Sequence, residues 1–421
     1  MLEIQRIREN KNHFILGLSK RNIEDSKSIV DKLIQVDDRR KMLKKNSDNI
    51  LSKYNKISKE IGINVNKGDS TKIKKLKKEN TILKQENKKI AFELKSVEKK
   101  IHDLLINLPN IPHKSVPSGN KEEDNEIIIV SKKTESIKGK IPHWELIKKY
   151  DIIDFELGNK ITGAGFPVYK EKGAKLQRAL INYFLDEATK KGYAEIQPPI
   201  LVNEKSGFGT GQIPDKEGQM YKIESENLYL IPTAEVPITN IYRDQIIIDK
   251  SLPIKNVAYT PCFRKEAGSW GSHVRGLNRL HQFDKIEIVH IENPENSYKA
   301  LEEMCNYVEN LLKSIEIPYR KIRLCAGDLG FTSSLTYDFE VFSPGQNKWL
   351  ECSSISNFET YQSNRLNLKI KSNKTKVLAH TLNGSALALP RIMASIIEVN
   401  QKKDKIKIPK VLVPYTGFDE I

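Results

Sequence analysis

Cysteine is scarce in this 421-residue chain, and long apolar runs are missing. The four cysteines are scattered and form no C-x-x-C pair, so neither a zinc site nor a disulfide framework is expected, whereas a reducing cytoplasm is. No stretch approaches the roughly 20 apolar residues that cross a bilayer as a helix. The first ten residues also lack the apolar core of a signal peptide. A cytoplasmic protein that does not enter the membrane is therefore predicted.

The glycine-rich signatures of nucleotide-binding parallel sheets are missing as well, because neither GxGxxG nor a P-loop occurs. Helices are expected at Leu176–Lys191 and Tyr298–Ile315, and a strand at Tyr193–Val202 is interrupted by a Pro pair. Further strands are expected around Leu228–Ile231, Val257–Phe263, Leu280–His290, Tyr337–Phe342 and Lys376–Leu382. Strands that recur with hairpin-like spacing predict an antiparallel α+β body.

Acidic residues are outnumbered, with 54 Asp and Glu against 70 Lys and Arg and a net charge of +16. The excess is concentrated near the N-terminus. Residues 29–61 hold nine basic and five acidic residues, and residues 71–100 hold eleven and four, while 62–70 is neutral, so +11 lies in this region. Two interpretations stay open: a solvated coiled-coil surface, or a basic prong for a nucleic-acid backbone.

The same region has the apolar spacing of a coiled coil. In each of 29–61 and 73–104, eight of ten positions in a 4-3 repeat are apolar, which predicts two helices of roughly 50 Å with a narrow seam. The turn-rich segment Gly62–Ser70 separates them, so they are expected to be antiparallel. Folding the chain about residue 67 places Ser47 opposite Asn87 and Tyr54 opposite Asn80, and the first pair could hydrogen-bond and fix the register.

Three domains follow from these patterns. An N-terminal domain is predicted at 1–108, with its arm at about 27–105. A linker at 109–126 contains three prolines, a Ser-Gly pair and an acidic run. The α+β body is predicted at 127–421.

Within the body, the segment Cys262–Glu287 reads as a strand, a polar loop and a second strand. Side chains two apart share one face of a strand, which groups Phe283, Lys285 and Glu287 on the second strand. On the first strand, Arg264 and Glu266 are expected to share a face in the same way. Such a face is too polar for a core, and it suits a ligand with phosphates, a flat base and an amine.

Four segments in this order resemble the motifs of the seryl-tRNA synthetase family of class II aminoacyl-tRNA synthetases: Thr233–Asn240, Cys262–Glu287, Glu351–Ser354 and His380–Arg391. The resemblance covers essentially the whole chain. It implies an antiparallel class II core flanked by helices, a homodimer, and a coiled coil that grips the long variable arm of tRNA(Ser). It further implies activation of L-serine with ATP and Mg²⁺ to seryl-adenylate, then transfer to the 3′-terminal adenosine. No organic cofactor is implied.

The resemblance also assigns the ATP site. The implied residues are Arg264, Lys265, Glu266, Arg279, Phe283, Glu351, Cys352, Ser353, Ser354 and Arg391. Of these, Arg264 would contact the α-phosphate, Phe283 and Arg391 would sandwich adenine, and Glu351, with Ser354 beside it, would bind the Mg²⁺ that accompanies ATP. Arg264, Arg391 and Glu351 are the implied catalytic residues.

For serine, the resemblance points to Thr233, Ala234, Glu235, Glu287, Asn383 and Ser385. Carboxylates satisfy an ammonium and polar groups satisfy a hydroxyl, but the sequence leaves open which Glu takes the ammonium. No general base is assigned, because a serine carboxylate is already ionised, and His281 is expected to be a structural, hydrogen-bonded residue. The loop Ala267–Asn278 is a candidate contact for the tRNA acceptor end.

Some residues depart from the common family pattern. Ala386 and Pro390 stand where glycine is usual, and Gly165 stands where arginine is frequent. Pro390 fits the first position of a helix that carries Arg391 in its first turn. The pair Pro198-Pro199 resembles the element that builds the family's dimer interface, and an edge position is expected for it.

Three alternatives compete with this resemblance. A class II synthetase for another amino acid would not account for the basic arm together with Thr233-Ala-Glu235 and Asn383-Gly-Ser385. A non-catalytic relative would be expected to lack Arg264, Glu351 or Arg391. A coiled-coil scaffold with an unrelated body would leave the polar face of the hairpin unexplained.

Overall fold

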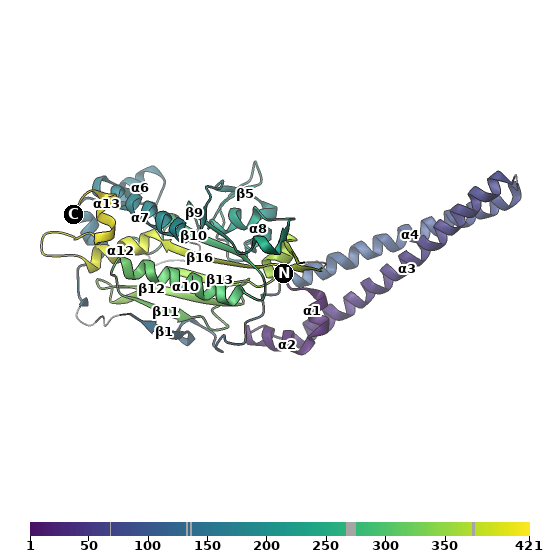
Figure 1. The fold of residues 1–421 in the computed structure, drawn as a ribbon, viewed down its shortest axis with the longest axis horizontal. Helices are drawn as coiled ribbons and strands as arrows, with labels where there is room; N and C mark the ends of the chain where they lie inside the picture. Colours follow the sequence, from purple (N-terminus) through teal and green to yellow (C-terminus); the bar gives the residue numbers. More distant parts are fainter. Residues whose placement is uncertain (68, 132–133, 135–136, 267–274, 373–374) are drawn as a thin grey trace. The chain divides into compact units, whose positions relative to one another are not determined.

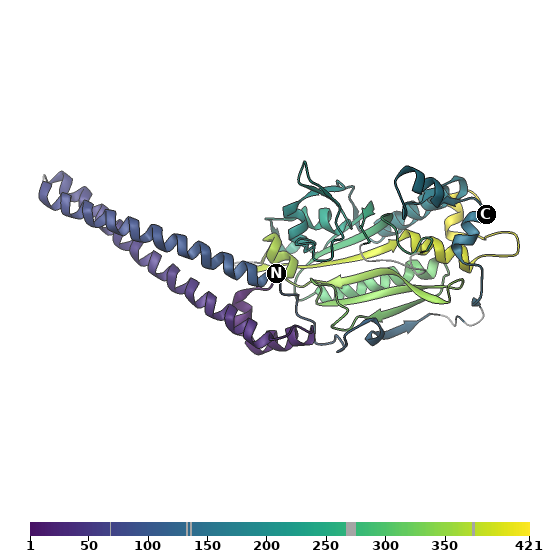
Figure 2. The same cartoon turned by 180° about the vertical axis from the view of Figure 1, so that it is seen from behind.

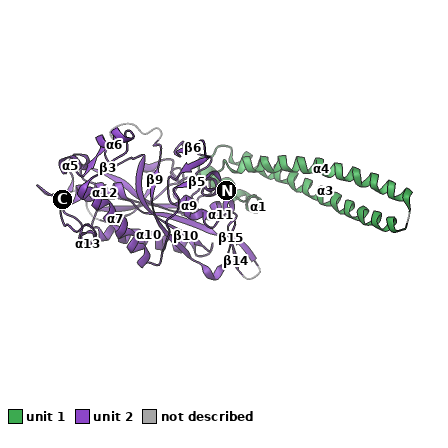
Figure 3. Cartoon of the chain, turned by 90° about the horizontal axis from the view of Figure 1, so that it is seen from above, with its two compact units in different colours: residues 1–109 green, residues 110–421 purple. Residues whose placement is uncertain are grey.

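The structure, a computed structural model, describes all residues except 68, 132–133, 135–136, 267–274 and 373–374. The chain forms two compact units, Met1–Pro109 and Asn110–Ile421 (Figure 3). The boundary lies at the start of the expected linker. There Asn110 donates its side-chain amide to the carbonyls of Thr332 and Phe358 at 2.9 and 2.8 Å, so the second unit holds this end of the segment.

The first unit is helical and ends in a long antiparallel hairpin (Figure 1). Its helices are α1 (Ile4–Glu9), α2 (Lys11–Lys20), α3 (Ser26–Asn66) and α4 (Ser70–Leu105). The expected break at 62–70 is therefore wrong at its start, because α3 continues through 62–66. A single glycine in an exposed helix costs only about 1 kcal/mol relative to alanine, too little to end a helix that is already propagating. The Asp69 side chain caps α4 by accepting from the amide of Lys72 at 3.0 Å.

Polar layers set the register of the hairpin. Ser47 donates to Asn87 Oδ1 at 2.8 Å, which confirms the predicted layer. Asn80 instead donates to Ser58 at 2.8 Å, one turn beyond the Tyr54 predicted opposite it. Apolar seam residues, including Leu43 and Leu76, are buried between the helices.

The second unit is built on an eight-stranded sheet with the order β1-β11-β12-β13-β16-β10-β9-β4. In that order the strands are Glu126–Val130, Tyr319–Arg323, Leu335–Ser343, Lys348–Asn357, His380–Ala388, Gln282–Glu292, Ile254–Phe263 and Ala194–Glu195. All neighbours are antiparallel except β4 and β9. The antiparallel α+β prediction is thus confirmed, and β4 lies at the edge of the sheet just before Pro198-Pro199.

Three helices bury the apolar side of this sheet: α7 (Glu171–Lys190), α10 (Ser297–Ser314) and α12 (Leu389–Val399) (Figures 1 and 2). They share one core with the inward side chains of the strands. Helix α7 buries the Leu176, Leu180 and Phe184 side chains that the sequence places on one face. Pro390 is the second residue of α12, one position later than expected.

Smaller elements complete the second unit. They are η1 (Glu122–Asp124), α5 (His143–Lys149), β2 (Ile153–Asp154), α6 (Phe155–Ile161), β3 (Val168–Tyr169), β5 (Leu201–Asn203), α8 (Glu204–Thr210), β6 (Lys222–Ile223), β7 (Leu228–Leu230), α9 (Glu235–Asn240), β8 (Ile246–Ile248), η3 (Asp249–Ser251), α11 (Tyr361–Leu366), β14 (Lys369–Ser372), β15 (Thr375–Leu378), η5 (Lys410–Leu412) and α13 (Val413–Thr416). The single strand expected at 376–382 is two strands. Between them, Ala379 is buried and donates its amide to Leu368 instead of continuing the ladder. None of the helices among the described residues is both long and apolar enough to cross a membrane.

Candidate functional site

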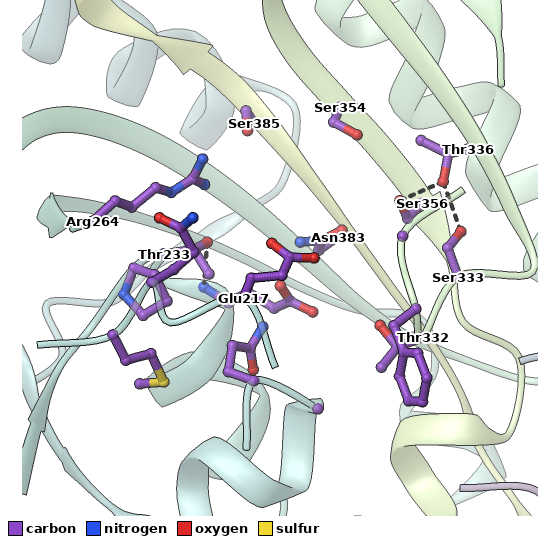
Figure 4. Close-up of a pocket in the computed structure, with 18 of the residues that line it drawn as sticks. Glu217, Thr233, Arg264, Thr332, Ser333, Thr336, Ser354, Ser356, Asn383 and Ser385 are labelled. Carbon is purple, nitrogen blue, oxygen red and sulfur yellow. Dashed lines mark hydrogen bonds between the residues drawn. The ribbon is translucent and has the colours of Figure 1, made fainter. Parts of the chain in front are cut away.

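The polar face of the central strands opens into a cavity of about 570 Å³ (Figure 4). On β10, Ile286 and Ile288 point into the helix-covered core, whereas Lys285 and Glu287 line the cavity. This is the two-residue alternation that the sequence predicts for this strand. On β16 the same alternation buries Leu382 in the core and sends Asn383 and Ser385 to the cavity.

Arg264 lies at the cavity wall, where its guanidinium carbon is 5.3 Å from the centre of the Phe283 ring. Strand β9 ends at Phe263, and Glu266 has a left-handed backbone with φ of 49°. The expectation that Arg264 and Glu266 share a strand face is therefore wrong, because the left-handed turn breaks the alternation. Both side chains still reach the cavity, and Glu266 accepts from Arg279 at 3.0 Å.

A second cavity of about 80 Å³ adjoins this wall and is lined by Phe283 on one element and Arg391 on another. Arg391 is fixed by two backbone carbonyls: its Nη1 donates to Glu351 O at 2.6 Å and its Nε to Asn278 O at 3.3 Å. The buried Cys352 also lines this space. A ring and a guanidinium held apart in this way suit a flat base between them.

Carboxylates of β12 and β13 form an acidic patch beside these cations. Glu351 is half exposed and lies 3.8 Å from Arg391. Asp338 is paired in register with Ser354, and its pKa is raised well above the usual range by burial and by Glu351. Asp338 Oδ1 is buried without a hydrogen-bond partner among the described atoms. Glu340, opposite Glu351, forms an ion pair with Arg320.

This patch fits a hard cation that is held mainly by phosphates. Mg²⁺ takes oxygen ligands and is usually bound by only one or two carboxylates together with nucleotide phosphates. Glu351 and Ser354 line the cavity and supply such oxygens. Among the described residues, no group of three or more His, Cys, Asp and Glu side chains could hold a metal ion unaided.

A buried polar network forms the floor of the larger cavity. Lys285 Nζ lies 2.5 Å from Glu287 Oε2 and donates to Thr233 Oγ1 at 2.9 Å. The other carboxylate oxygen of Glu287 accepts from Asn383 at 3.0 Å. Lys285 and Glu287 are almost fully buried, so each charge depends on the other.

Glu235 lies in the same floor and forms no ion pair with a described residue, although Lys285 and Arg264 act on it electrostatically. Its Oε1 accepts from Gln362 at 2.6 Å, and Gln362 in turn accepts from Thr381 at 2.7 Å. Burial, and then repulsion from Glu287, raises the pKa of Glu235 to about 7. The carboxyl is thus prepared for an incoming cation that would favour its charged form.

Three residues that the resemblance assigns to the site do not line either cavity. Lys265 is exposed and lies over the Tyr221 ring at 5.9 Å. Ser353 is buried and donates to the Ser385 carbonyl at 2.5 Å. Ala234 is buried in a small apolar cluster. None of the three is among the residues that line the two cavities.

His281 is a structural residue, as expected. Its Nδ1 lies 2.6 Å from the Tyr221 hydroxyl, and its ring stacks on Phe166 at 5.2 Å. Gly165, one of the departures, is required here: its φ is +83°, and a Cβ would lie 2.5 Å from His281 Cδ2. Ala386 is accommodated in the core. Of the loop 267–278, residues 267–274 lie outside the described part of the chain.

Several cavity residues carry no signal that the sequence alone reveals. Ser333, Thr336 and Ser356 form a hydroxyl row, with contacts of 2.6 and 2.9 Å (Figure 4). Isolated Ser and Thr residues are common in strands and loops, so their spacing indicates nothing. Arg365 of α11 lines the cavity, and Gln362 of the same helix donates to Glu235; both lie far along the chain from the residues that they contact. Alternation groups Lys285 with Phe283 and Glu287, but the sequence indicates no role for it.

Family models match both units of the chain. Residues 221–400 match the tRNA synthetase class II core domain (G, H, P, S and T), so the fold and the cavity define a class II aminoacyl-tRNA synthetase. Residues 1–112 match the seryl-tRNA synthetase N-terminal domain. The serine–tRNA ligases of Salinibacter ruber and Methylacidiphilum infernorum are 43% and 45% identical, covering 100% and 99% of this chain and 99% of each relative. The chain belongs to the seryl-tRNA synthetase family.

Solved structures agree with this assignment. The seryl-tRNA synthetase of Pyrococcus horikoshii, complexed with ATP, has a TM-score of 0.91 and 34% identity over 100% of this chain and 99% of its own. The cytoplasmic serine–tRNA ligase of Naegleria fowleri, in complex with AMP, has a TM-score of 0.89 and 28% identity over 100% and 98%.

The raised pKa of Glu235 predicts a pH-dependent stability. Between the ordinary Glu pKa of about 4.3 and about 7, the unfolded carboxyl is charged while the folded one stays largely protonated, so stability falls as pH rises. Glu235→Gln removes this penalty. We expect the variant to be more stable than the wild type by about 3 kcal/mol at pH 8, a difference that vanishes toward pH 4. Urea unfolding across this range measures it.

Glu287→Gln is the matched control. It leaves the buried Lys285 without its anionic partner, so it should destabilise the protein at pH 8. If Glu235→Gln destabilised the protein equally at that pH, Glu235 would not carry the unfavourable charge described here.

Proposed function

We propose that the protein is a serine–tRNA ligase. It activates L-serine with ATP to give seryl-adenylate and pyrophosphate, then transfers serine to the 3′-terminal adenosine of tRNA(Ser). One observation carries the proposal: a cationic, aromatic half of the cavity with Arg264, Phe283 and Arg391 adjoins a buried half with two carboxylates, Glu235 and Glu287. The first half suits a nucleoside triphosphate, and the second suits a small amino acid with a side-chain hydroxyl.

In the activation step the serine carboxylate approaches the α-phosphate of ATP. Both groups are anionic, and the cations of the site reduce their repulsion. We assign Arg264 to the α-phosphate, where a planar guanidinium can contact two oxygens at once. Phe283 and Arg391 hold adenine in the smaller cavity, and Arg279 serves the terminal phosphates. The serine carboxylate attacks phosphorus in its ionised form, so no protein base is needed for this step.

Mg²⁺ bound with ATP would neutralise phosphate charge and orient the pyrophosphate leaving group. Glu351 and Ser354 would hold it from β13. Burial and Glu351 raise the pKa of Asp338, and a divalent cation in this place would favour its ionised form and so add negative charge to the site. The carboxylate patch supports this assignment: Glu340 is paired with Arg320 and Glu351 lies 3.8 Å from Arg391, whereas Asp338 forms no ion pair with a described residue.

The two carboxylates of the floor have separate roles in this proposal. Glu287 is already neutralised by Lys285, so we assign it, with Asn383, to the serine hydroxyl. Glu235 forms no ion pair with a described residue, and its pKa is raised to about 7; we assign it, with Thr233, to the serine ammonium. Alanine has no hydroxyl, so it would leave Glu287 and Asn383 without this hydrogen-bond partner. Such a loss costs about 1–3 kcal/mol for each buried group.

The arm is proposed to bind the long variable arm of tRNA(Ser), and charge distribution points to the outer face of α4. At about 100° per residue, seven lysines lie within about 60° of Phe92 on this face. They are Lys74, Lys77, Lys78, Lys88, Lys89, Lys95 and Lys99, all exposed. The acidic residues of 71–100 lie about 100° or more from Phe92, and Phe92 is 80% exposed. Lysines around an aromatic ring suit a phosphate backbone with a stacked base.

The outer face of α3 is different, because acidic and basic residues alternate on it. Asp38 and Glu60 lie in the same sector as Lys45 and Lys56. Such mixed faces are typical of solvated coiled-coil surfaces. The two faces of one hairpin therefore provide an internal comparison for RNA binding.

A homodimer in the cytoplasm completes the proposal. Strand β4 lies at the sheet edge and is followed by Pro198-Pro199, where the backbone cannot complete a ladder within the chain. This edge is the proposed dimer contact. All four cysteines are free and buried, a state that a reducing compartment maintains.

Amino-acid-dependent ATP–pyrophosphate exchange across the twenty amino acids tests the activity. We expect exchange with serine and, at equal concentration, far less with threonine, alanine or proline. Exchange led by another amino acid, or none with any, would contradict the proposal.

Replacement of Phe283 by alanine removes one wall of the smaller cavity between Phe283 and Arg391, which we call the adenine slot. We expect the KM for ATP to rise about tenfold, since stacking of a base on an aromatic ring contributes about 1–3 kcal/mol, while the KM for serine stays within about twofold. Initial rates of pyrophosphate exchange at varied ATP and varied serine separate the two. Equal increases in the KM for ATP and the KM for serine would contradict the stacking role of Phe283.

For the arm, we expect Lys88→Ala/Lys95→Ala/Lys99→Ala to raise the KM for tRNA(Ser) at least tenfold at physiological salt. Its salt dependence should also fall by about two to three units of slope, because each phosphate contact contributes about 0.7–0.9. Pyrophosphate exchange should not change. Deletion of 29–104 should abolish charging and likewise spare activation.

The matched control is Lys45→Ala/Lys53→Ala/Lys56→Ala on α3, which removes the same charge. It should change the KM for tRNA(Ser) by less than about threefold. If the two triple variants lose affinity equally, binding depends on the total charge of the arm and not on the α4 face.

A further inference from the structure

A buried histidine–carboxylate pair lies behind the adenine slot, outside the residues assigned above. His143, the first residue of α5, and Glu398 in α12 are both fully buried. Glu398 Oε1 accepts from the Nδ1 and from the backbone amide of His143, at 2.7 and 2.9 Å. Burial alone would raise the pKa of Glu398, but hydrogen bonds from His143 and Ser343 lower it below the usual range.

The partners of His143 define its protonation. The backbone amide of Leu277 donates to His143 Nε2 at 2.9 Å. An amide can only donate, so Nε2 must be the acceptor, and the ring hydrogen is on Nδ1, facing Glu398. The imidazole is therefore neutral, with one donor and one acceptor, both used.

The same residues fit closely against the end of the hairpin loop. Gly276 has a φ of +67°, and a Cβ on it would lie 2.3 Å from His143 Nε2. Only glycine allows both this backbone conformation and this approach. The next residue of α5, Trp144, carries the Arg275 guanidinium over its ring at 5.3 Å. Two consecutive side chains thus hold the chain on both sides of Gly276.

This anchored segment leads directly to the ATP site. Leu277 lines the adenine slot, and the carbonyl of Asn278 accepts from Arg391 Nε. The side chain of Asn278 pairs with Gln346 at 2.8 Å, and Gln346 donates to Ser343 at 2.9 Å. Ser343 and the amide of Gly345 donate to the second oxygen of Glu398 at 2.5 and 2.9 Å. These hydrogen bonds and the backbone from Leu277 to Asn278 form a closed circuit that joins the pair to the carbonyl that holds Arg391, and Arg279 is the next residue of the chain.

We propose that His143 is a positioning residue for ATP: as a neutral acceptor for the Leu277 amide, it fixes residues 275–279 and through them Arg279 and Arg391. The inference rests on the proposed function, because it concerns how ATP is held in that reaction. In this proposal the Nε2 atom of His143 holds the Leu277 amide, whereas the bond from Nδ1 to Glu398 orients the ring.

Two substitutions separate the two bonds of the ring. In His143→Asn, the shorter amide can replace Nδ1 as a donor to Glu398 but leaves the Leu277 amide without its acceptor. In His143→Gln, the longer side chain can bring its carbonyl oxygen to the place of Nε2 and accept from Leu277, while the donor to Glu398 is lost. Both variants lose one buried hydrogen bond, so a purely structural role predicts similar behaviour for the two.

The experiment measures serine-dependent pyrophosphate exchange and thermal unfolding of the full-length chain. We expect His143→Asn to raise the KM for ATP about tenfold, as for loss of an acceptor from a buried donor, with the KM for serine within about twofold. His143→Gln should keep the KM for ATP within about threefold of wild type. Both should lower the Tm to a similar extent.

The proposal is overturned if the two variants raise the KM for ATP equally, if serine and ATP are affected alike, or if His143→Gln is the more impaired. Should His143→Asn not fold, a rise of more than threefold in the KM for ATP of His143→Gln overturns it, and a smaller rise supports it. Absence of exchange in the wild type would instead refute the proposed function, so the two failures are distinct.

Discussion

The functional half of this molecule depends on the two-residue alternation of its central strands. In β10, β13 and β16, one set of side chains is buried under α7, α10 and α12, and the other set faces the cavity. A shift of one residue in any strand would place charges in the core and apolar groups in the site. The same burial that stabilises the sheet therefore determines which side chains meet the substrates.

Charge compensation then determines how these side chains behave. Lys285 neutralises Glu287, Arg320 neutralises Glu340, and Glu266 pairs with Arg279. Glu235 and Asp338 are buried and form no ion pair within the described part of the chain, and burial raises the pKa of each. Buried carboxyls without a cationic partner destabilise a fold when they ionise, and both lie where a cationic ligand, an ammonium or Mg²⁺, would favour their charged form. The stability lost at these two places is consistent with a binding role.

Local patterns allowed much of this architecture to be predicted from the sequence. The 4-3 repeat predicts the α3–α4 hairpin and its Ser47–Asn87 layer, and alternation predicts the face that Phe283, Lys285 and Glu287 share. Long-range pairing was not predictable. Gln362 meets Glu235 across 127 positions, and His143 meets Leu277 across 134. The error at Glu266 has a local cause, since a left-handed residue ends the alternation, and no sequence period signals such a turn.

The distribution of charge gives the two units different physical tasks. Most of the net charge belongs to residues 29–100, where the α4 lysines are exposed and screened by salt. The charges of the cavity are largely buried, so salt screens them much less. The proposed binding of RNA by the arm should therefore weaken steeply with ionic strength, whereas catalysis in the cavity should not. A narrow coiled-coil seam suffices for the arm because it only has to hold a charged face in place, while the cavity requires a full core to position its buried ions.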